Sequence, residues 1–403
     1  MKIIGIIVEY NPLQNGHAYQ IEVAKQQFNA DYVVLVMTGN FNERGLPAII
    51  PKENRARMGI NAGADLVIEL PTCYSLSDLP RMALGAIEIF DKIGVVDNLL
   101  FGSELGELYE IEDMSEIMTS DRYLLLYDEF FKTTAITSKA REKAFIALGF
   151  EKYARCINNP NNLLGVTFLQ TLKTINSKIK PITHKRIGQS YLDDSVELKT
   201  DKKIFSSATA VRRMIKESYL HNGTISEKLK CCVPSYVYDD LVLSFNMHFP
   251  VFSDDFNNLI LCAIKNSTIQ KISDIDGIDD LLANELFHSA NEALDFDIFD
   301  SQIRQRFPHI NIDRRYYRIL TNQTAEDIHE YEKNGSVFFA SILAAGKRAG
   351  PLLDRMKDES KIDFFYEDNM TVSICNLGMK QLENNRSADC IYNTVLYEKF
   401  GRK

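Results

Sequence analysis

The sequence predicts an α/β fold, with a Rossmann-like parallel sheet in the N-terminal part of the chain and a mostly helical C-terminal part. Short β-branched runs recur with helical stretches between them, and this alternation is typical of βαβ units and a parallel sheet. Beyond residue 217 the strand signal fades while helical patterns continue. We therefore expect one domain over residues 1–217 and a mainly α-helical domain over residues 218–403. The expected strands cover residues 3–8, 32–37, 65–69, 98–101 and 182–186.

A turn-rich stretch follows the first expected strand. Residues 11–16 read Asn-Pro-Leu-Gln-Asn-Gly, and Ile21, Ala24 and Phe28 then fall on one helical face. The pattern therefore places His17 at the N-terminus of a helix.

Other stretches depart from the strand–helix alternation. Residues 108–150 are polar with a helical pattern, which predicts a helical insertion before the last strand of the sheet. In the second domain we expect helices over residues 234–243, 257–264 and 278–294. Residues 364–375 and 385–397 are expected to add a few strands to that domain.

Length and composition indicate a multidomain globular protein. The chain has 403 residues, of which 45% are hydrophobic and 25% charged, and this length corresponds to roughly two to three domains. The opening segment lacks the features of a signal peptide, and no apolar run reaches the ~18 residues of a membrane span. We therefore expect a soluble, cytoplasmic protein.

The cysteines predict neither disulfides nor a zinc site. They are odd in number, scattered, and contain no C-x-x-C pair, so reduced thiols are the simplest interpretation. The adjacent pair is expected to be core thiols and not nucleophiles, because no basic cluster nearby lowers a thiol pKa. The seven are Cys73, Cys156, Cys231, Cys232, Cys262, Cys375 and Cys390.

The charge balance argues against indiscriminate binding to nucleic acid, because the net charge is −9 and the pI is near 5.4. Local basic groups are compatible with this balance, although a solvated helix face is the commoner explanation of each one. The groups are Arg212, Arg213 and Lys216; Arg314, Arg315 and Arg318; and Lys347, Arg348, Arg355 and Lys357.

The turn after the first strand has the chemistry of a phosphate site. Ligands of open parallel sheets bind at the carboxyl ends of the strands, where helix N-termini favour anions. Gly16 lets backbone approach a phosphate, and His17 can donate to the oxygens of a pentavalent phosphorus transition state. Taken alone, a Gly-His turn is as often only a turn.

Six ordered stretches make the assignment specific. They are GIIVEYNPLQNGH, TGNFNERGLPAI, NAGADLVIELP, FGSE, PNNLLGVTFLQTLK and SSATAVR. The first resembles the adenylyltransferase superfamily with its HxGH or TxGH signature. Together the six resemble the tRNA(Met) cytidine acetate ligase family across the N-terminal half and, more loosely, down to RSADCIY near the C-terminus.

This resemblance implies a reaction in two steps. Acetate attacks the α-phosphorus of ATP to give acetyl-adenylate and pyrophosphate, and the acetyl group then passes to N4 of the wobble cytidine of elongator tRNA(Met). The implied cofactor is ATP, with Mg²⁺ expected alongside the nucleotide, although no acidic cluster in the sequence identifies a dedicated metal site. No membrane or DNA partner is implied.

The resemblance also implies the site residues. The implied catalytic residues are His17, Gln14 and Arg186. The implied ATP-binding residues are Ile7, Val8, Glu9, Tyr10, Asn11, Pro12, Leu13, Gln14, Asn15, Gly16, His17, Ala18, Tyr19, Gln20, Gly102, Asn161, Asn162, Arg186, Ser207, Thr209 and Arg212.

Several of these residues have structural alternatives. Gly102 also fits a tight turn, and the asparagines of residues 161–162 also fit helix capping. Arg186 is alternatively an exposed strand arginine, and Ser207 a helix cap. Residues 39–45 either cover the bound adenylate or form a structural loop.

Two residues depart from the family pattern. Gln14 stands where the signature has its first histidine; it can donate a hydrogen bond to phosphate but cannot carry a charge. Glu43 replaces a glutamine and adds a carboxylate near a polyanion site, which disfavours binding unless Arg44 pairs with it. Reduced activity is therefore expected in preference to none.

Two other functions remain open at this stage. One is adenylyl transfer to a small phosphate-bearing metabolite, and the other is a paralogue that binds nucleotide or RNA without turnover. For RNA, we expect a groove between the C-terminal domain and the carboxyl edge of the sheet, with cations from the Arg314 and Lys347 regions.

Overall fold

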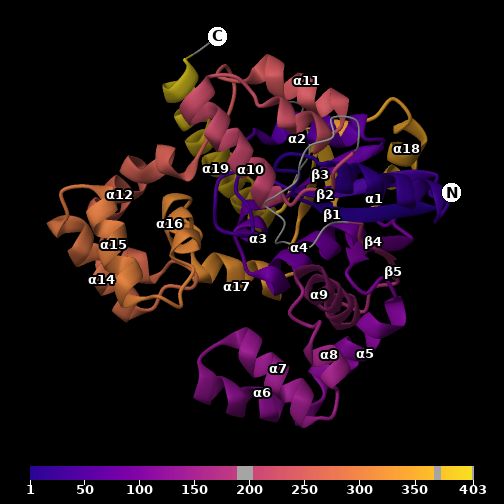
Figure 1. Cartoon of the computed structure of the whole chain (residues 1–403), viewed down its shortest axis with the longest axis horizontal. Coiled ribbons are helices and arrows are strands. Elements are labelled where there is room, and N and C mark those ends of the chain that lie inside the picture. Colours follow the sequence, from indigo (N-terminus) through magenta and orange to yellow (C-terminus); the bar gives the residue numbers. More distant parts are fainter. Residues whose placement is uncertain (188–202, 367–373, 402–403) are drawn as a thin grey trace.

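The computed structural model describes residues 1–187, 203–366 and 374–401, and a seven-stranded sheet lies at the centre of this described part (Figure 1). The strand order is β5-β4-β1-β2-β3-β6-β7. The five strands of the N-terminal part are parallel, which confirms the predicted parallel sheet. The strands are β1 (Ile3–Val8), β2 (Tyr32–Thr38), β3 (Leu66–Leu70), β4 (Asn98–Ser103), β5 (Lys180–Lys185), β6 (Phe339–Ala345) and β7 (Asp363–Tyr366).

The central strands are buried on both faces, as a parallel sheet covered by helices requires. On β2, Val33 and Leu35 belong to one hydrophobic core, while Val34 and Val36 belong to the core on the opposite face. This alternation explains why the strands read as continuous apolar runs in the sequence.

Helices cover the two faces of the sheet. The first face carries α1 (Asn15–Gln26), α2 (Lys52–Asn61), α10 (Ala208–Glu217) and α11 (Ser235–Ser244), whose apolar residues share one core. The second face carries α3 (Thr72–Ser75), α4 (Leu79–Lys92), α9 (Pro160–Thr174), α17 (Ala325–Lys333) and α18 (Gly350–Glu359).

The predicted insertion is helical. It consists of α5 (Leu108–Thr119), α6 (Asp121–Thr134), α7 (Thr137–Ala147) and α8 (Glu151–Ala154). Helices α6 and α7 pack on each other and project away from the sheet in Figure 1.

A third core lies among the helices of the C-terminal part. These are α12 (Asn257–Lys265), α13 (Ile269–Ser273), α14 (Asp280–Glu292), α15 (Phe296–Arg306) and α16 (Ile312–Leu320), with part of the long α19 (Asn376–Phe400). Short helical turns, η1 (Ser218–Asn222), η2 (Glu227–Cys231) and η3 (Ser253–Phe256), connect this part to the sheet.

The strands expected in the C-terminal part required two corrections. Residues 385–397 are helical and belong to α19, because Ala388, Tyr392 and Val395 recur at helical spacing and fill the third core. Strand β7 includes the start of the expected segment 364–375, of which residues 367–373 lie outside the described residues.

The C-terminal strands also belong to a different sheet from the one expected. Strand β6 pairs antiparallel with β3, and β7 pairs with β6, so both extend the N-terminal sheet. A domain boundary near residue 217 stays a prediction, but the sheet itself draws strands from both sides of it.

The structure also bears on the cysteines and on membrane-spanning helices. None of the seven cysteines, all within the described ranges, forms a disulfide. No helix among the described residues combines the length and hydropathy needed to cross a membrane.

Candidate active site

The topology of the sheet directs attention to the carboxyl ends of β1 and β4. These strands are neighbours, yet the chain continues from β1 through β2 to β3 on one side and from β4 to β5 on the other. Such a switch point leaves a crevice in which open α/β sheets bind ligands. The turn of residues 9–14 leaves β1 at this point, and α1 begins at Asn15.

His17 lies in the first turn of α1 and has a defined tautomer. The backbone N–H of Gln14 donates to Nδ1 of His17 at 3.2 Å, so the neutral ring carries its proton on Nε2. Burial lowers the pKa of His17 to about 3, and the positive charges of Arg186 and Arg212 lower it further. His17 is therefore a neutral hydrogen-bond donor at physiological pH, in contact with the ring of Tyr10 at a centroid distance of 5.1 Å.

Gln14 joins the start of α1 to the start of α10. The side chain is buried, and its amide N–H donates to the Ser206 carbonyl at 3.0 Å while its oxygen accepts from the Ala208 N–H at 3.2 Å, in the orientation that satisfies both ends. Gln14 therefore forms a bridge between two helix N-termini, and its direct contact with phosphate stays a prediction. Its polarity is required for that bridge, and its charge is not.

Other polar residues of the turn form hydrogen bonds within the protein. Asn15 donates from Nδ2 to the carbonyl oxygens of Ile204 at 3.1 Å and Cys231 at 2.7 Å. Asn11 accepts from the Ile49 N–H at 2.9 Å through Oδ1. The remaining residues of the implied stretch divide by exposure: Ile7, Glu9, Gly16, Ala18, Tyr19 and Gln20 are half-buried, whereas Val8, Pro12 and Leu13 are buried.

Gly102 and Arg186 lie side by side on β4 and at the end of β5. A Cβ on Gly102 would approach Cγ of Arg186 to 2.9 Å and Nε2 of His184 to 3.1 Å, so the glycine keeps this side of the crevice open. Arg186 is exposed, and its charge reaches His17.

His184 is a residue that the sequence did not single out. It is buried, and its Nε2 has no hydrogen-bond partner among the described residues. Burial lowers its pKa, which makes it a neutral ring beside Gly102. In the sequence, His184 is only a histidine inside a short strand. That pattern is too common to identify a residue that contacts a bound molecule.

The asparagines at the start of α9 hold the loop after β4. Asn162 is fully buried; its Oδ1 accepts from the N–H groups of Glu104 at 2.9 Å and Leu105 at 3.3 Å, and its Nδ2 donates to the Cys156 carbonyl at 3.0 Å. Asn161 donates to the Glu104 carboxylate at 2.6 Å. The amide of Asn162 is thus occupied by main chain, and the adenine contact considered for it is not what this geometry favours.

Helix α10 places the predicted residues Ser207, Thr209 and Arg212 beside the crevice. Ser207 is its N-cap and accepts from the Ala210 N–H at 3.2 Å, which is the structural role anticipated for it. Arg212 donates to the Asn11 carbonyl at 3.3 Å and lowers the pKa of His17. Thr209 lies on the same helix, one turn before Arg212.

A fully buried arginine anchors the carboxyl ends of β1 and β2. Arg55, on α2, donates to the carbonyl oxygens of Glu9 at 2.7 Å and Thr38 at 3.1 Å, and also to that of Gly39. Because these carbonyls end two adjacent strands, Arg55 fixes the loops that border the crevice. Sequence reasoning missed it, since an arginine on a polar helix carries no sign of burial.

A buried ion cluster ties the C-terminal helix to the same edge. Lys52 donates to both carboxylate oxygens of Glu69 at 2.9 Å and to the carboxylate of Asp389 on α19. Asn40 donates to Asp389 at 2.8 Å, so the loop after β2 is held by the same cluster. Residues 39–45 therefore have a structural role. The one local signal was the charged Glu69 inside an apolar strand.

Glu43 lies half-buried in this loop. Burial raises its pKa, and so does the negative charge of Glu9, while Arg44 and Arg314 act in the opposite direction. The carboxylate of Glu43 is therefore influenced by two arginine cations as well as by another carboxylate, and its net pKa is raised above that of an ordinary glutamate.

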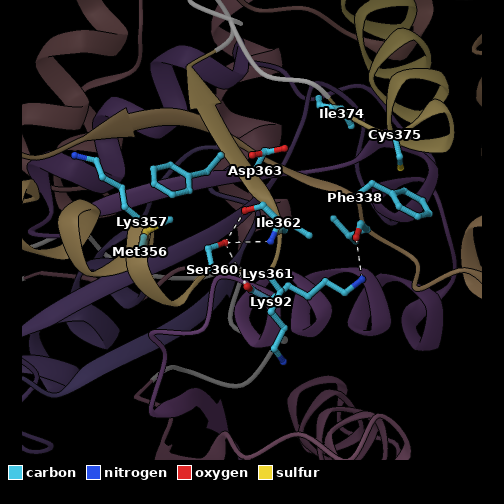
Figure 2. Close-up of a pocket in the computed structure, with 12 residues that line it drawn as sticks. Lys92, Phe338, Met356, Lys357, Ser360, Lys361, Ile362, Asp363, Ile374 and Cys375 are labelled. Carbon is cyan, nitrogen blue, oxygen red and sulfur yellow. Dashed lines mark hydrogen bonds between the residues drawn. The ribbon is translucent and has the colours of Figure 1, made fainter.

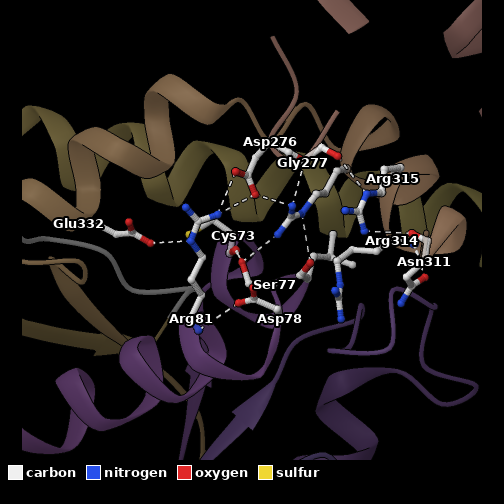
Figure 3. Close-up of polar contacts among 12 residues, drawn as sticks. Cys73, Ser77, Asp78, Arg81, Asp276, Gly277, Asn311, Arg314, Arg315 and Glu332 are labelled. Carbon is white, nitrogen blue, oxygen red and sulfur yellow. Dashed lines mark hydrogen bonds and ion pairs between the residues drawn. The ribbon is translucent and has the colours of Figure 1, made fainter. Parts of the chain in front are cut away.

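The three basic groups of the sequence differ in their surroundings. Arg318 is 4% exposed and donates to the Leu76 and Asp276 carbonyls and to the Ser77 hydroxyl. Figure 3 shows the neighbouring Arg81, Asp276 and Glu332 linked by ion pairs. The Arg318 side chain is thus buried structural charge, which overturns its predicted place in an RNA groove.

The group around Lys347 lies at the wrong edge of the sheet for a groove at the site. Arg348 donates to the Asp31 carbonyl at 2.8 Å and covers the ring of Tyr32, where β2 begins. Arg355 and Lys357 form ion pairs with neighbours on their own helix. The α10 group borders the crevice, and Arg314 of the second group donates to the Glu43 carbonyl in the loop after β2.

A cavity of about 580 Å³ lies elsewhere, between α4, α18 and β7 (Figure 2). Its lysines are engaged: Lys92 donates to the Val337 carbonyl at 2.9 Å, and Lys361 pairs with Asp91 at 3.3 Å. It contains none of the predicted site residues. No group of three His, Cys, Asp or Glu side chains in the described ranges is arranged to hold a metal ion.

Comparison with known proteins identifies the family of this chain. A family model described as HIGH nucleotidyl transferase matches residues 1–403. The chain therefore belongs to the HIGH nucleotidyl transferase family.

The similar curated proteins carry a more particular name, tRNA(Met) cytidine acetate ligase. The chain is 32% identical to the one of Acetivibrio thermocellus, over 94% of this chain and 92% of that protein. It is 31% identical to that of Alkaliphilus metalliredigens, over 92% and 88%. The crystal structure of Thermotoga maritima TmcAL bound with alpha-thio ATP superposes with a TM-score of 0.85 at 25% identity, covering 99% of this chain and 96% of that one.

Proposed function

We propose that this chain activates acetate with ATP and transfers the acetyl group to N4 of the wobble cytidine of elongator tRNA(Met). The observation that carries the proposal is the neutral His17, with its proton on Nε2, at the switch point of the sheet and within the electrostatic influence of Arg186 and Arg212. The similarity to the acetate ligases over nearly the whole chain supports the choice of substrates.

The residues fit a nucleotide at this point. The N-termini of α1 and α10 meet there and favour a polyanion. Gly102 has no side chain to fill the crevice beside Arg186. Next to it, the unpartnered Nε2 of His184 offers a polar contact. Magnesium would reach this site with the phosphates of ATP, because no cluster of three acidic, His or Cys ligands occurs in the described residues.

In the first step, a carboxylate oxygen of acetate forms a bond to the α-phosphorus while the bond to the pyrophosphate oxygen breaks. Charge grows on the equatorial oxygens and on the leaving group. The Nε2–H of His17 donates to the former, and Arg186 and Arg212 stabilise the latter. In the second step N4 attacks the acetyl carbon, AMP leaves with the bonding electrons, and the nitrogen loses a proton.

The proposal is tested by measuring acetate-dependent exchange of pyrophosphate into ATP together with N4-acetylcytidine formation on tRNA. We expect both activities in the wild-type protein and a loss of about 10²–10³-fold in exchange for His17→Ala, because one preorganised transition-state donor is removed. His248→Ala is the matched control, since that histidine is exposed and far along the chain in the C-terminal part.

The products distinguish the alternatives. Pyrophosphate exchange without N4-acetylcytidine would show that the acceptor is a molecule other than tRNA. Absence of exchange despite ATP binding would refute catalysis by this chain. Since ATP and tRNA are both cytoplasmic substrates, we place the reaction in the cytoplasm.

A further inference from the structure

Two neutral histidines lie at the crevice, and the main chain fixes them in opposite tautomers. Nδ1 of His17 accepts from the Gln14 N–H, so the proton of this ring is on Nε2. Nδ1 of His184 lies 3.1 Å from the Lys185 carbonyl oxygen, which can only accept, so the proton of His184 is on Nδ1. Nε2 of His184 is therefore an acceptor, whereas Nε2 of His17 is a donor.

The acceptor atom of His184 is buried and unused. The residue is 8% exposed, and its Nε2 has no hydrogen-bond partner among the described residues. Burial lowers the pKa of His184, so the ring is neutral and Nε2 carries no proton at physiological pH. A buried acceptor without a partner costs free energy, because its hydrogen bond to water is lost and not replaced. A histidine with only a structural role would have both nitrogens paired, so this atom indicates a bound donor.

The register of the sheet places this acceptor beside Gly102. Gly102 and His184 are partners across β4 and β5. A Cβ on Gly102 would lie 3.1 Å from Nε2 of His184 and 2.9 Å from Cγ of Arg186, so a side chain at position 102 would cover the acceptor. The Arg186 side chain is exposed and can turn aside when a molecule enters.

Aromatic rings lie around the same point. The Tyr19 ring of α1 meets the His184 ring edge to face at a centroid distance of 5.8 Å, and it meets the Phe205 ring in the same way at 6.1 Å. Phe205 also lies 3.9 Å from the position of a Cβ on Gly16. Rings and glycine backbone are surfaces on which a nucleobase packs.

The charges decide which end of a nucleotide lies beside His184. The phosphates belong near His17, because the N-termini of α1 and α10 and the cation of Arg212 lie at that end. In the sheet order, β5 is two strands away from β1, with β4 between them. Two strand spacings are about 10 Å, a distance that a nucleoside spans, so the base reaches β5 when the phosphates lie at β1.

We propose that His184 selects the base of the nucleotide, with its Nε2 accepting a hydrogen bond from the 6-amino group of an adenine that lies over Gly102. This inference rests on the proposed function, because it concerns the base end of the same nucleotide. Adenine has a donor at position 6, whereas guanine and hypoxanthine have an oxygen there that only accepts. An oxygen opposite Nε2 would leave both acceptors unpaired, so His184 is a specificity-determining residue that excludes 6-oxo purines.

The test compares nucleotides that differ only at position 6 of the purine. Calorimetry measures equilibrium binding of ATP, of purine riboside triphosphate, which lacks the amino group, and of inosine triphosphate, which has an oxygen there. The wild-type protein should bind ATP at least about tenfold more tightly than either analogue, because the buried acceptor stays unpaired without the amino donor. His184→Leu should remove this preference by weakening the binding of ATP alone.

Two further variants accompany His184→Leu. His184→Ile removes the same acceptor with a β-branched residue that suits a strand, and urea denaturation checks that each variant is folded. His248→Leu is the matched control, because it makes the same change at an exposed histidine and should keep the preference for ATP.

Three outcomes would overturn the proposal. Equal binding of ATP and purine riboside triphosphate by the wild-type protein does so whatever the variants show. A preference that persists in both His184 variants assigns the amino group to another residue, and a preference lost equally in His248→Leu makes the effect unspecific. Absence of acetate-dependent exchange in the wild-type protein refutes the proposed function alone, because nucleotide binding still reports on the base.

Discussion

Helices α10 and α16 each carry three cationic residues within a short stretch, and the structure uses them in opposite ways. On α10, Arg212 borders the crevice, and Lys216 lines a cavity with its side chain 44% exposed. On α16, Arg318 is buried against Asp276, and the half-buried Arg315 donates to the Gly277 carbonyl at 3.1 Å.

The difference between the two helices lies in what surrounds each charge. Desolvation is the largest influence on Arg318 and lowers its pKa to about 10, although Asp276 acts in the opposite direction. A buried arginine whose N–H groups already donate to protein acceptors stabilises the fold and cannot contact a phosphate in solution. A run of arginines therefore predicts a nucleic-acid contact only where solvent reaches it.

The largest effect that this comparison predicts is on stability. Arg318→Ala should lower the free energy of unfolding by about 3 kcal/mol, because the buried Leu76 and Asp276 carbonyls and the Ser77 hydroxyl lose their donor and Asp276 keeps only Arg81 as its ion-pair partner among the described residues. Urea denaturation measures the change. Arg315→Ala is the control on the same helix, since its side chain contacts main-chain carbonyls at a half-buried position. Equal destabilisation by both variants would contradict the distinction between them.

The next effect is on the first chemical step. Arg212→Ala should reduce acetate-dependent pyrophosphate exchange by about tenfold or more with little change in unfolding, because a charge-assisted contact to the leaving group is lost. Measuring exchange and urea midpoint on the same preparations separates the two. If Arg315→Ala reduced exchange as much as Arg212→Ala, proximity to the crevice would not be what matters.

The smallest effect concerns pH. The pKa of His17 is lowered from 6.5 to about 3, so the unfolded chain takes up this proton first as the pH falls. Its contribution to stability is therefore fully present above about pH 6.5 and is lost as the pH falls toward 3. Between pH 8 and about 5, the exchange rate should show no inflection from His17.

Nuclear magnetic resonance of the ring protons gives the direct measurement. The His17 signals should stay constant over the range in which an ordinary histidine titrates. A midpoint near 6.5 assigned to His17 would show that the ring is solvated and charged at neutral pH, and the role of a neutral donor would have to be abandoned.

The sequence by itself determined the five parallel strands and the turn that carries His17. Both rest on local information, since β-branched runs and turn residues act over a few neighbours. The positions of Gly102, Arg186 and Arg212 near that turn follow from the resemblance together with the rule that carboxyl ends of parallel strands share one edge.

Only the tertiary structure decided which polar groups remain available. Gln14, Asn162 and Arg318 look like ligand contacts in the sequence, and the structure shows each of them hydrogen-bonded to main-chain groups of distant segments. The same holds for β6, whose pairing with β3 joins remote parts of the chain. Burial and hydrogen bonding of this kind depend on contacts between segments that no local pattern records, because desolvation is a property of the packed surroundings and not of the residue.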